Sequence, residues 1–122
     1  MIRGRKSPVI HVIAYQKNPD SEVKLTVTPD PLDMTQYGRG RHVLTWKLDT
    51  KGFHFPNDGT AIEFTSPDWE KYFHDQKVSK DGRTVTVVDI NTGGLAFAYN
   101  VNVIHKETGD RVILDPVIQN DW

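Results

Sequence analysis

The sequence contains no cysteine among its 122 residues. This absence excludes disulfide bonds, thiol catalysis and thiolate metal sites. It also has no run that approaches the ~20 apolar residues of a membrane-spanning helix. The apolar part of segment 1–16 is short and interrupted by His11, which is atypical of a signal peptide. We therefore expect a cytoplasmic protein without a membrane partner.

A strong charge of either sign is also missing, because the formal net charge is −1. No block of basic residues stands out, so the composition predicts neither a nucleic-acid partner nor binding to an anionic membrane. Arg3, Arg5 and Lys6 fall within residues 1–7, which we expect to be a solvated tail. The length fits a single domain with one hydrophobic core.

Alternation of apolar and polar residues with a period of two dominates the chain and predicts β-strands. Turn-forming residues separate the alternating segments, and Asp81-Gly82 is typical of a hairpin. The clearest predicted strands cover residues 8–16, 22–28, 42–49, 83–89 and 95–106.

One segment has the features of a helix start. Ser66 can cap the helix, and Pro67 fits its first turn. We expect this helix to be short and to end near Tyr72. About eight short strands with so little helix are typical of an all-β, immunoglobulin-like antiparallel β-sandwich. The sequence thus predicts one such domain over residues 1–122, with Trp46 in its core.

The sequence offers no recognisable metal or cofactor motif. Its five histidines show no zinc-ligand spacing, although His42 and His54 could meet across neighbouring strands. The stretch Asn91–Gly94 lacks the lysine and the following helix of a phosphate-binding loop, so it predicts a turn. We expect no metal and no cofactor. The histidines are His11, His42, His54, His74 and His105.

Asp89 is a candidate catalytic acid. By parity it shares a strand face with Val85 and Val87, and burial on an apolar face would raise its pKa. The alternative is that the strand ends at Asp89, whose side chain then caps the following turn.

Asp115 and Pro116 interrupt the apolar C-terminal stretch. If Thr108-Gly109 formed a two-residue turn, the hairpin register would place Asn102 opposite Asp115. A proline is tolerated in an edge strand where its missing N–H faces outward. One interpretation is therefore that the Asp-Pro pair simply ends a strand.

The other interpretation is chemical. The Asp115 side chain can attack its own carbonyl carbon, form a five-membered cyclic anhydride and expel the proline nitrogen. A favourable orientation of such intramolecular attack can be worth roughly 7–11 kcal/mol. The leaving nitrogen needs a proton, which a second carboxyl group with a raised pKa could supply.

The block "FAYNVNVIHKETGDRVILDPVIQND", residues 97–121, resembles the DP-EP family of small bacterial proteins, above all in "LDPVIQND". The resemblance implies a β-sandwich with an aspartic-type peptidase activity, a hydrolase that acts on its own Asp-Pro bond. In this chain that bond is Asp115-Pro116, and the substrate is the chain's own C-terminal segment. Asp30-Pro31 lies in a loop outside the matching block, so we expect it to take no part.

Two functions remain as hypotheses. The first is autoproteolysis at Asp115-Pro116, with Asp115 and Asp89 as catalytic residues and Asn102 in support. The second is a non-enzymatic immunoglobulin-like module that binds protein, sugar or its own copies through an edge strand. Binding of its own copies would form a homo-oligomer. Both use a common scaffold, and the fold alone does not decide between them.

Overall fold

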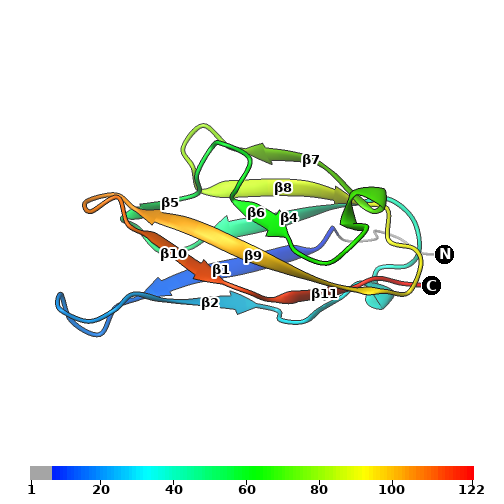
Figure 1. Cartoon of the computed structure of the whole chain (residues 1–122), viewed down its shortest axis with the longest axis horizontal. Coiled ribbons are helices and arrows are strands. Elements are labelled where there is room, and N and C mark those ends of the chain that lie inside the picture. The colour runs from blue at the N-terminus through cyan, green and yellow to red at the C-terminus, as the bar shows by residue number, and fades with distance from the viewer. Residues whose placement is uncertain (1–6) are drawn as a thin grey trace.

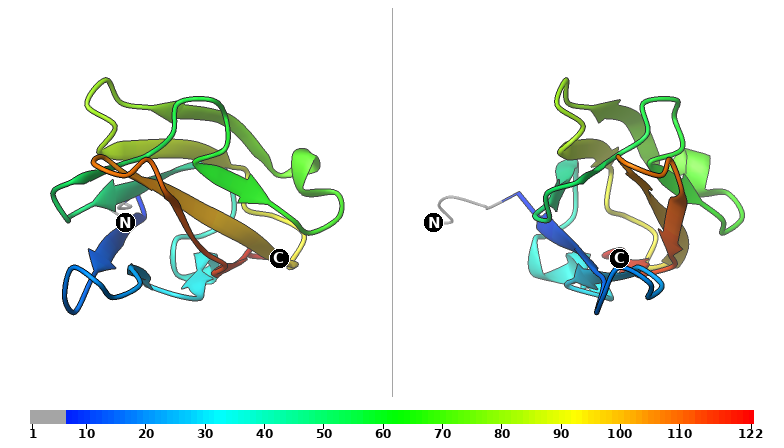
Figure 2. Two further views of the ribbon diagram at one scale, coloured as in Figure 1. Left: turned by 60° about the vertical axis from the view of Figure 1, so that its left-hand side comes forward. Right: turned by 90° about the vertical axis from the view of Figure 1, so that its left-hand side faces the viewer.

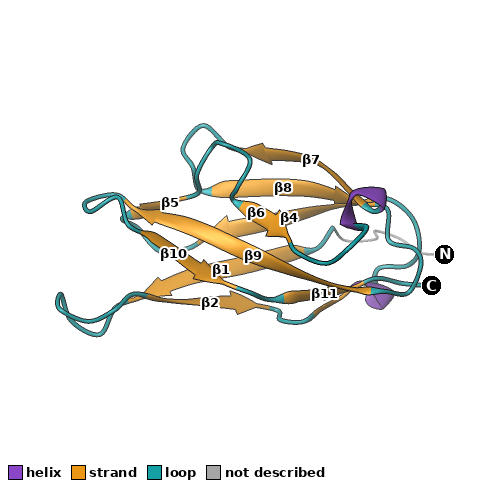
Figure 3. Ribbon diagram, viewed as in Figure 1, coloured by secondary structure: helices purple, strands orange, loops and turns teal. Residues whose placement is uncertain are grey.

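The computed structural model describes residues 7–122, which form eleven strands and no α-helix (Figure 1; Figure 3). The all-β prediction is confirmed, and the larger number of strands arises because several are only two or three residues long. Of the expected tail, residues 1–6 lie outside the described part of the chain. No helix in the described part is long and apolar enough to span a membrane.

The strands form two sheets, and each contains one parallel pairing. These pairings are β1 with β4 and β11 with β3, so the expectation of a purely antiparallel arrangement is wrong. The first sheet runs in the order β2 (Lys24–Thr28), β1 (Val9–Tyr15), β4 (His42–Leu48), β8 (Thr84–Asp89) and β7 (Phe73–Val78). The second contains β10 (Arg111–Leu114), β9 (Ala96–His105), β11 (Val117–Gln119) and β3 (Leu32–Asp33), with β5 (Phe53–His54) and β6 (Ile62–Phe64) also paired to β9.

Figure 2 shows the two sheets around a common interior, and the buried apolar side chains of both sheets form the hydrophobic core there. Strict alternation in β1 and β4 buries one face of each strand, as the sequence predicts. Trp46 is fully buried, and its indole N–H donates to the Tyr99 hydroxyl of the opposite sheet at 3.1 Å. This bond satisfies both polar groups, so the two large rings can pack at the centre without an unpaired donor.

β10 and β11 are collinear strands that pair with β9 in the same register. Leu114 pairs with Val101 and Val117 pairs with Ala98, so the antiparallel register against β9 continues unchanged across the interruption. β5 and β6 pair with β9 as well, through residues 99–105. β9 is therefore the central strand of the second sheet, and the Asp115-Pro116 junction lies directly beside it.

The chain crosses from one sheet to the other between β2 and β3. β2 pairs with β1 in the first sheet, whereas β3 pairs with β11 in the second. The crossing segment, residues 29–31, contains two prolines, which cannot donate to a ladder and so favour a break in pairing. This crossing brings Asp30 next to β11.

Two short 3₁₀ helices complete the fold, η1 (Met34–Gln36) and η2 (Trp69–Lys71). η2 occurs where a helix was predicted, but the Ser66 hydroxyl accepts from the Ala98 N–H at 2.8 Å and does not cap it. η1 was not predicted. It is capped by Asp33, whose carboxylate accepts from the Thr35 N–H at 3.0 Å.

Candidate functional site

Asp115 and Pro116 lie between β10 and β11, where the chain stays in line but regular pairing stops. Asp115 is exposed and Pro116 is buried. The Pro116 carbonyl accepts from the Tyr99 N–H at 3.1 Å. Since proline has no N–H, the ladder lacks the return bond to Tyr99. The bond between these two residues is thus held in place by strand pairing on both sides.

The hairpin that leads into β10 differs from the prediction. Ile113, not Asp115, pairs with Asn102, so the predicted register is wrong by two residues. The His105 N–H donates to the Asp110 carbonyl, which makes the turn four residues long. The His105 ring nitrogen Nδ1 accepts from the N–H groups of Glu107 and Thr108 at 3.2 and 3.4 Å and so stabilises this wider turn.

Asn102 consequently has partners other than Asp115. Its amide N–H groups donate to the Thr60 carbonyl at 2.6 Å and to a Glu63 carboxylate oxygen at 2.8 Å. Asn102 is fully buried, and its carbonyl oxygen has no hydrogen-bond partner among the described residues. These contacts tie β9 to the β6 region. By continuation of the register, the residue opposite Asp115 is Asn100.

Asp30 is the carboxyl group that the structure brings to the Asp115-Pro116 junction. Its Oδ1 accepts from the Val117 N–H at 3.0 Å. Because the Pro116 carbonyl faces β9, the Val117 N–H faces away from β9 and is available to a partner from the crossing segment. This contact was not predicted from the sequence. A second Asp-Pro pair just before a short strand was the available signal.

Asp89 is both buried on the apolar face and the cap of the following turn. It is the last residue of β8 and has an exposed fraction of 0%. Its Oδ1 accepts from the Asn91 N–H at 2.8 Å, as expected of a turn cap. Burial raises the pKa of Asp89 to about 6, although the Asn91 N–H and the neighbouring Asn120 amide both act to lower it.

The residues around Asp89 form a sealed polar cluster. Asn91 donates to the carbonyls of Met34 and Gly38, and its own side-chain oxygen accepts from the Asp121 N–H at 2.7 Å. Asn120 lies beside Asp89, but its side-chain atoms have no hydrogen-bond partner of good geometry among residues 7–122. The cluster therefore anchors the C-terminal residues to the first sheet and to the η1 loop.

The structure does not bring Asp89 and Asp115 together. Asp89 is buried at the end of β8 beside Asn120, whereas Asp115 is exposed before β11 begins. Among the described residues, no hydrogen bond joins them. The alternation of side chains along β8 correctly predicted that Asp89 faces the interior. This alternation does not predict which residues of the opposite sheet Asp89 contacts.

The histidines do not assemble into a site. His42 bonds to the Gly38 carbonyl and His54 to the Phe55 carbonyl, and they belong to strands of different sheets. In residues 7–122 no group of three or more histidine, aspartate or glutamate side chains could hold a metal ion. His11 instead pairs with Asp49 at 2.9 Å on the exposed surface.

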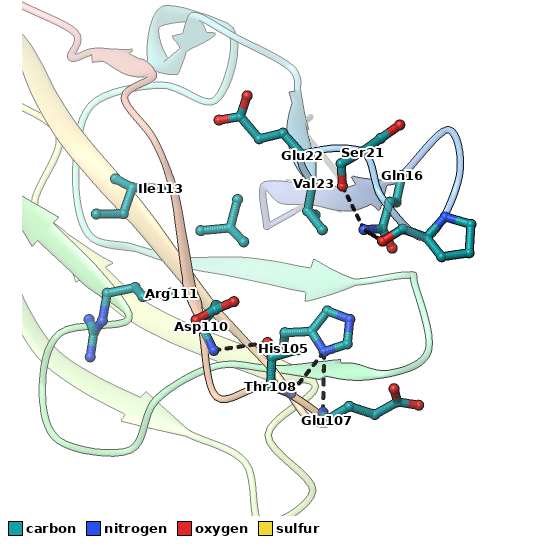
Figure 4. Close-up of a pocket in the computed structure, with 12 residues that line it drawn as sticks. Gln16, Ser21, Glu22, Val23, His105, Glu107, Thr108, Asp110, Arg111 and Ile113 are labelled. Carbon is teal, nitrogen blue, oxygen red and sulfur yellow. Dashed lines mark hydrogen bonds between the residues drawn. The ribbon is translucent and has the colours of Figure 1, made fainter.

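An open cleft of about 810 Å³ lies between the β1–β2 loop and the β9–β10 hairpin (Figure 4). Carboxylates of Glu22, Glu107 and Asp110 line it, together with apolar groups of Val23 and Ile113.

No protein-family model and no curated protein matches the chain. The geometry of the Asp115-Pro116 junction and of the cleft is therefore the basis for the proposals below.

Proposed function

We propose that the protein is a self-processing, aspartate-dependent peptidase that hydrolyses its own Asp115-Pro116 bond. The observation that carries this proposal is the anchoring of that bond. The Pro116 carbonyl is fixed by the Tyr99 N–H and the Val117 N–H by Asp30, while the Asp115 carboxylate is exposed and bonds to no residue in 7–122. The chain thus restrains the scissile segment and leaves its nucleophile free.

The proposed reaction has two steps. A carboxylate oxygen of Asp115 attacks the carbonyl carbon of the same residue, a cyclic anhydride forms, and the bond to the Pro116 nitrogen breaks. That nitrogen takes up a proton and leaves as an amine. One water molecule then opens the anhydride, so Asp115 ends with a main-chain and a side-chain carboxyl group.

We assign the proton-donating role to Asp30 in place of Asp89. The Asp30 carboxyl group lies against the residue directly after the leaving nitrogen, whereas Asp89 is sealed beside Asn120. Because Asp30 is exposed, water can supply the proton that it passes to the leaving nitrogen in the single cleavage event.

The resemblance to the DP-EP family supports this function, and we propose membership in that family. We also infer that the two packed sheets form an immunoglobulin-like sandwich. The crossing of the chain from β2 to β3 and the buried Trp46 at the centre of the core support this inference.

Cleavage would leave the fragment from Pro116 to Trp122 docked. Ile118 is fully buried, and the Asp121 carbonyl accepts from the Gly94 N–H at 2.7 Å. The fragment also keeps its pairing with β9 and β3. The product should therefore elute like the intact chain in size-exclusion chromatography and separate only under denaturing conditions.

The test is a comparison of wild type with Asp115→Asn and Pro116→Ala by denaturing mass spectrometry during storage at mildly acidic pH. We expect fragments 1–115 and 116–122 from the wild type and slower cleavage in both variants. An alanine nitrogen is a less basic leaving group than that of proline. Equal cleavage of the wild type and Asp115→Asn would refute the proposal.

A further inference from the structure

The outer edge of β10 carries unpaired backbone groups. In the antiparallel register with β9, Asp110 and Pro116 direct their carbonyls toward β9. By alternation, Arg111 and Ile113 direct their N–H and C=O groups the other way. Those groups bond to no other described residue, and the Ile113 side chain is 54% exposed. β10 is thus an open edge, which is a template for another strand.

The neighbouring element is β2, which runs beside β10 without a ladder between them. Farther along the chain, β3 and β11 pair regularly, and Asp30 bonds to Val117. β2 and β10 therefore meet at the crossing and separate toward the two loop tips (Figure 1). The 810 Å³ cleft occupies the wide end of this separation.

The opposite seam between the sheets is closed. There the Gln76 side chain of β7 bonds to both the N–H and the carbonyl of Ile62 in β6, at 3.1 and 2.8 Å. Phe64 and Phe73 stack across the same seam with ring centroids 4.1 Å apart. This side-chain amide takes the place of a strand partner, so the edge of β6 is covered while that of β10 is not.

The charge of the cleft is predominantly negative. Glu22, Glu107 and Asp110 line it, whereas the Arg111 guanidinium donates to Thr60 and lies 3.8 Å from Asp58. Figure 4 shows Arg111 extending away from the β1–β2 loop. A basic ligand would therefore match the cleft, and an acidic ligand would be repelled.

We propose that this cleft binds an extended basic peptide, which adds as a strand to the free edge of β10. Main-chain bonds to Arg111 and Ile113 would supply affinity, and lysine or arginine side chains would reach the carboxylates. The volume falls within the range of roughly 300–1,000 Å³ typical of ligand pockets. The proposal is independent of the self-cleavage proposed above.

The probe is an acetylated and amidated heptapeptide of alternating lysine and valine, with a glutamate–valine peptide as its matched control. Titration of freshly purified protein followed by amide NMR should show saturable shifts at Arg111 and Ile113 with the basic peptide. The acidic peptide should bind at least about tenfold more weakly. Absence of binding by the basic peptide, or equal binding of both, would overturn the proposal.

Two substitutions at one position separate main-chain from side-chain recognition. Ile113→Pro removes the outward N–H and is compatible with an edge strand, so we expect binding to weaken at least about tenfold. Ile113→Ala keeps the N–H and should bind within roughly threefold of wild type. The thermal midpoint of each variant verifies its fold. A folded Ile113→Pro variant that binds like Ile113→Ala would contradict strand addition.

Discussion

Two regions near the C-terminal end use aspartate side chains to hold the chain together, and they differ in exposure. Asp89 is fully buried and caps a turn beside Asn120. Asp115 is exposed in the break between β10 and β11, and the exposed Asp30 accepts from the Val117 N–H that follows this break. The same type of side chain thus serves in a sealed cluster and at an open junction.

The difference motivates the choice of carboxyl groups in the proposed reaction. Asp89 has the raised pKa expected of a proton donor, but it lies in the cluster with Asn120 and not at the Asp115-Pro116 bond. Asp115 carries its target on its own residue, and Asp30 lies at the next backbone N–H. A raised pKa therefore does not by itself identify the reacting acid, because structural burial produces it as well.

The largest effect is expected for Asp89→Asn on stability. The pKa of Asp89 in the folded protein, about 6, lies above the ordinary aspartate value of about 3.8. The folded state therefore binds the proton more tightly, and stability rises as the pH falls from about 6 to about 4. Relative to the variant, the wild type should gain about 3 kcal/mol as the pH falls from 7 to about 3, and most of this gain occurs above pH 4.

Chemical unfolding of wild type and Asp89→Asn at a series of pH values measures this gain. Hydrogen bonds, mainly from nearby threonine or serine hydroxyls, lower the pKa values of Asp33, Asp58 and Asp81. Protonation of these carboxylates below about pH 4 therefore lowers the stability of both proteins. Their contributions cancel when the stability curve of the variant is subtracted from that of the wild type. A difference curve that stays flat from pH 7 to pH 4 would show that Asp89 is not in a sealed environment. The cleavage rate should be the same in both proteins.

The second largest effect is expected for Asp115→Asn on cleavage. A neutral amide cannot close the anhydride, so the rate should fall at least about 100-fold, or about 2.7 kcal/mol in the barrier. Stability should stay close to that of wild type, because the side chain is exposed and makes no hydrogen bond within the described part of the chain. Denaturing mass spectrometry gives the rate, and thermal unfolding gives the stability.

A smaller effect is expected for Asp30→Asn. The asparagine oxygen can still accept from the Val117 N–H, so the junction keeps its geometry while it loses the acid. We expect cleavage to slow by roughly tenfold, or about 1.4 kcal/mol, since water can partly replace an exposed proton donor. An unchanged rate in this variant would remove Asp30 from the reaction and leave Asp115 to act with solvent.

The sequence predicted the strands well, because alternation is a local property. β1 and β4 follow the period of two throughout, β9 follows it except at the buried Asn102, and Trp46 lies in the core as expected. The hairpin register failed because His105 accepts two backbone N–H groups and widens the turn. A side chain that bonds within its own turn leaves no trace in a hydrophobic pattern.

The candidate site was predicted only in part, for a related reason. Asp115 and Pro116 were recognised from bond chemistry, which depends on two adjacent residues. The partnership of Asp30 with Val117 depends on the crossing of the chain between sheets. Contacts between residues so far apart follow from topology, which a single sequence specifies weakly.

The most direct test of self-cleavage at Asp115-Pro116 is intact mass spectrometry of the wild-type chain after incubation at mildly acidic pH in water enriched in oxygen-18. The account predicts a fragment that ends at Asp115 and carries one heavy oxygen. Carbon-13 NMR isotope shifts should locate a share of that oxygen in the side-chain carboxyl group, because water can open the anhydride at either carbonyl. A chain that keeps its full mass for weeks, or heavy oxygen confined to the main-chain carboxyl group, would contradict it.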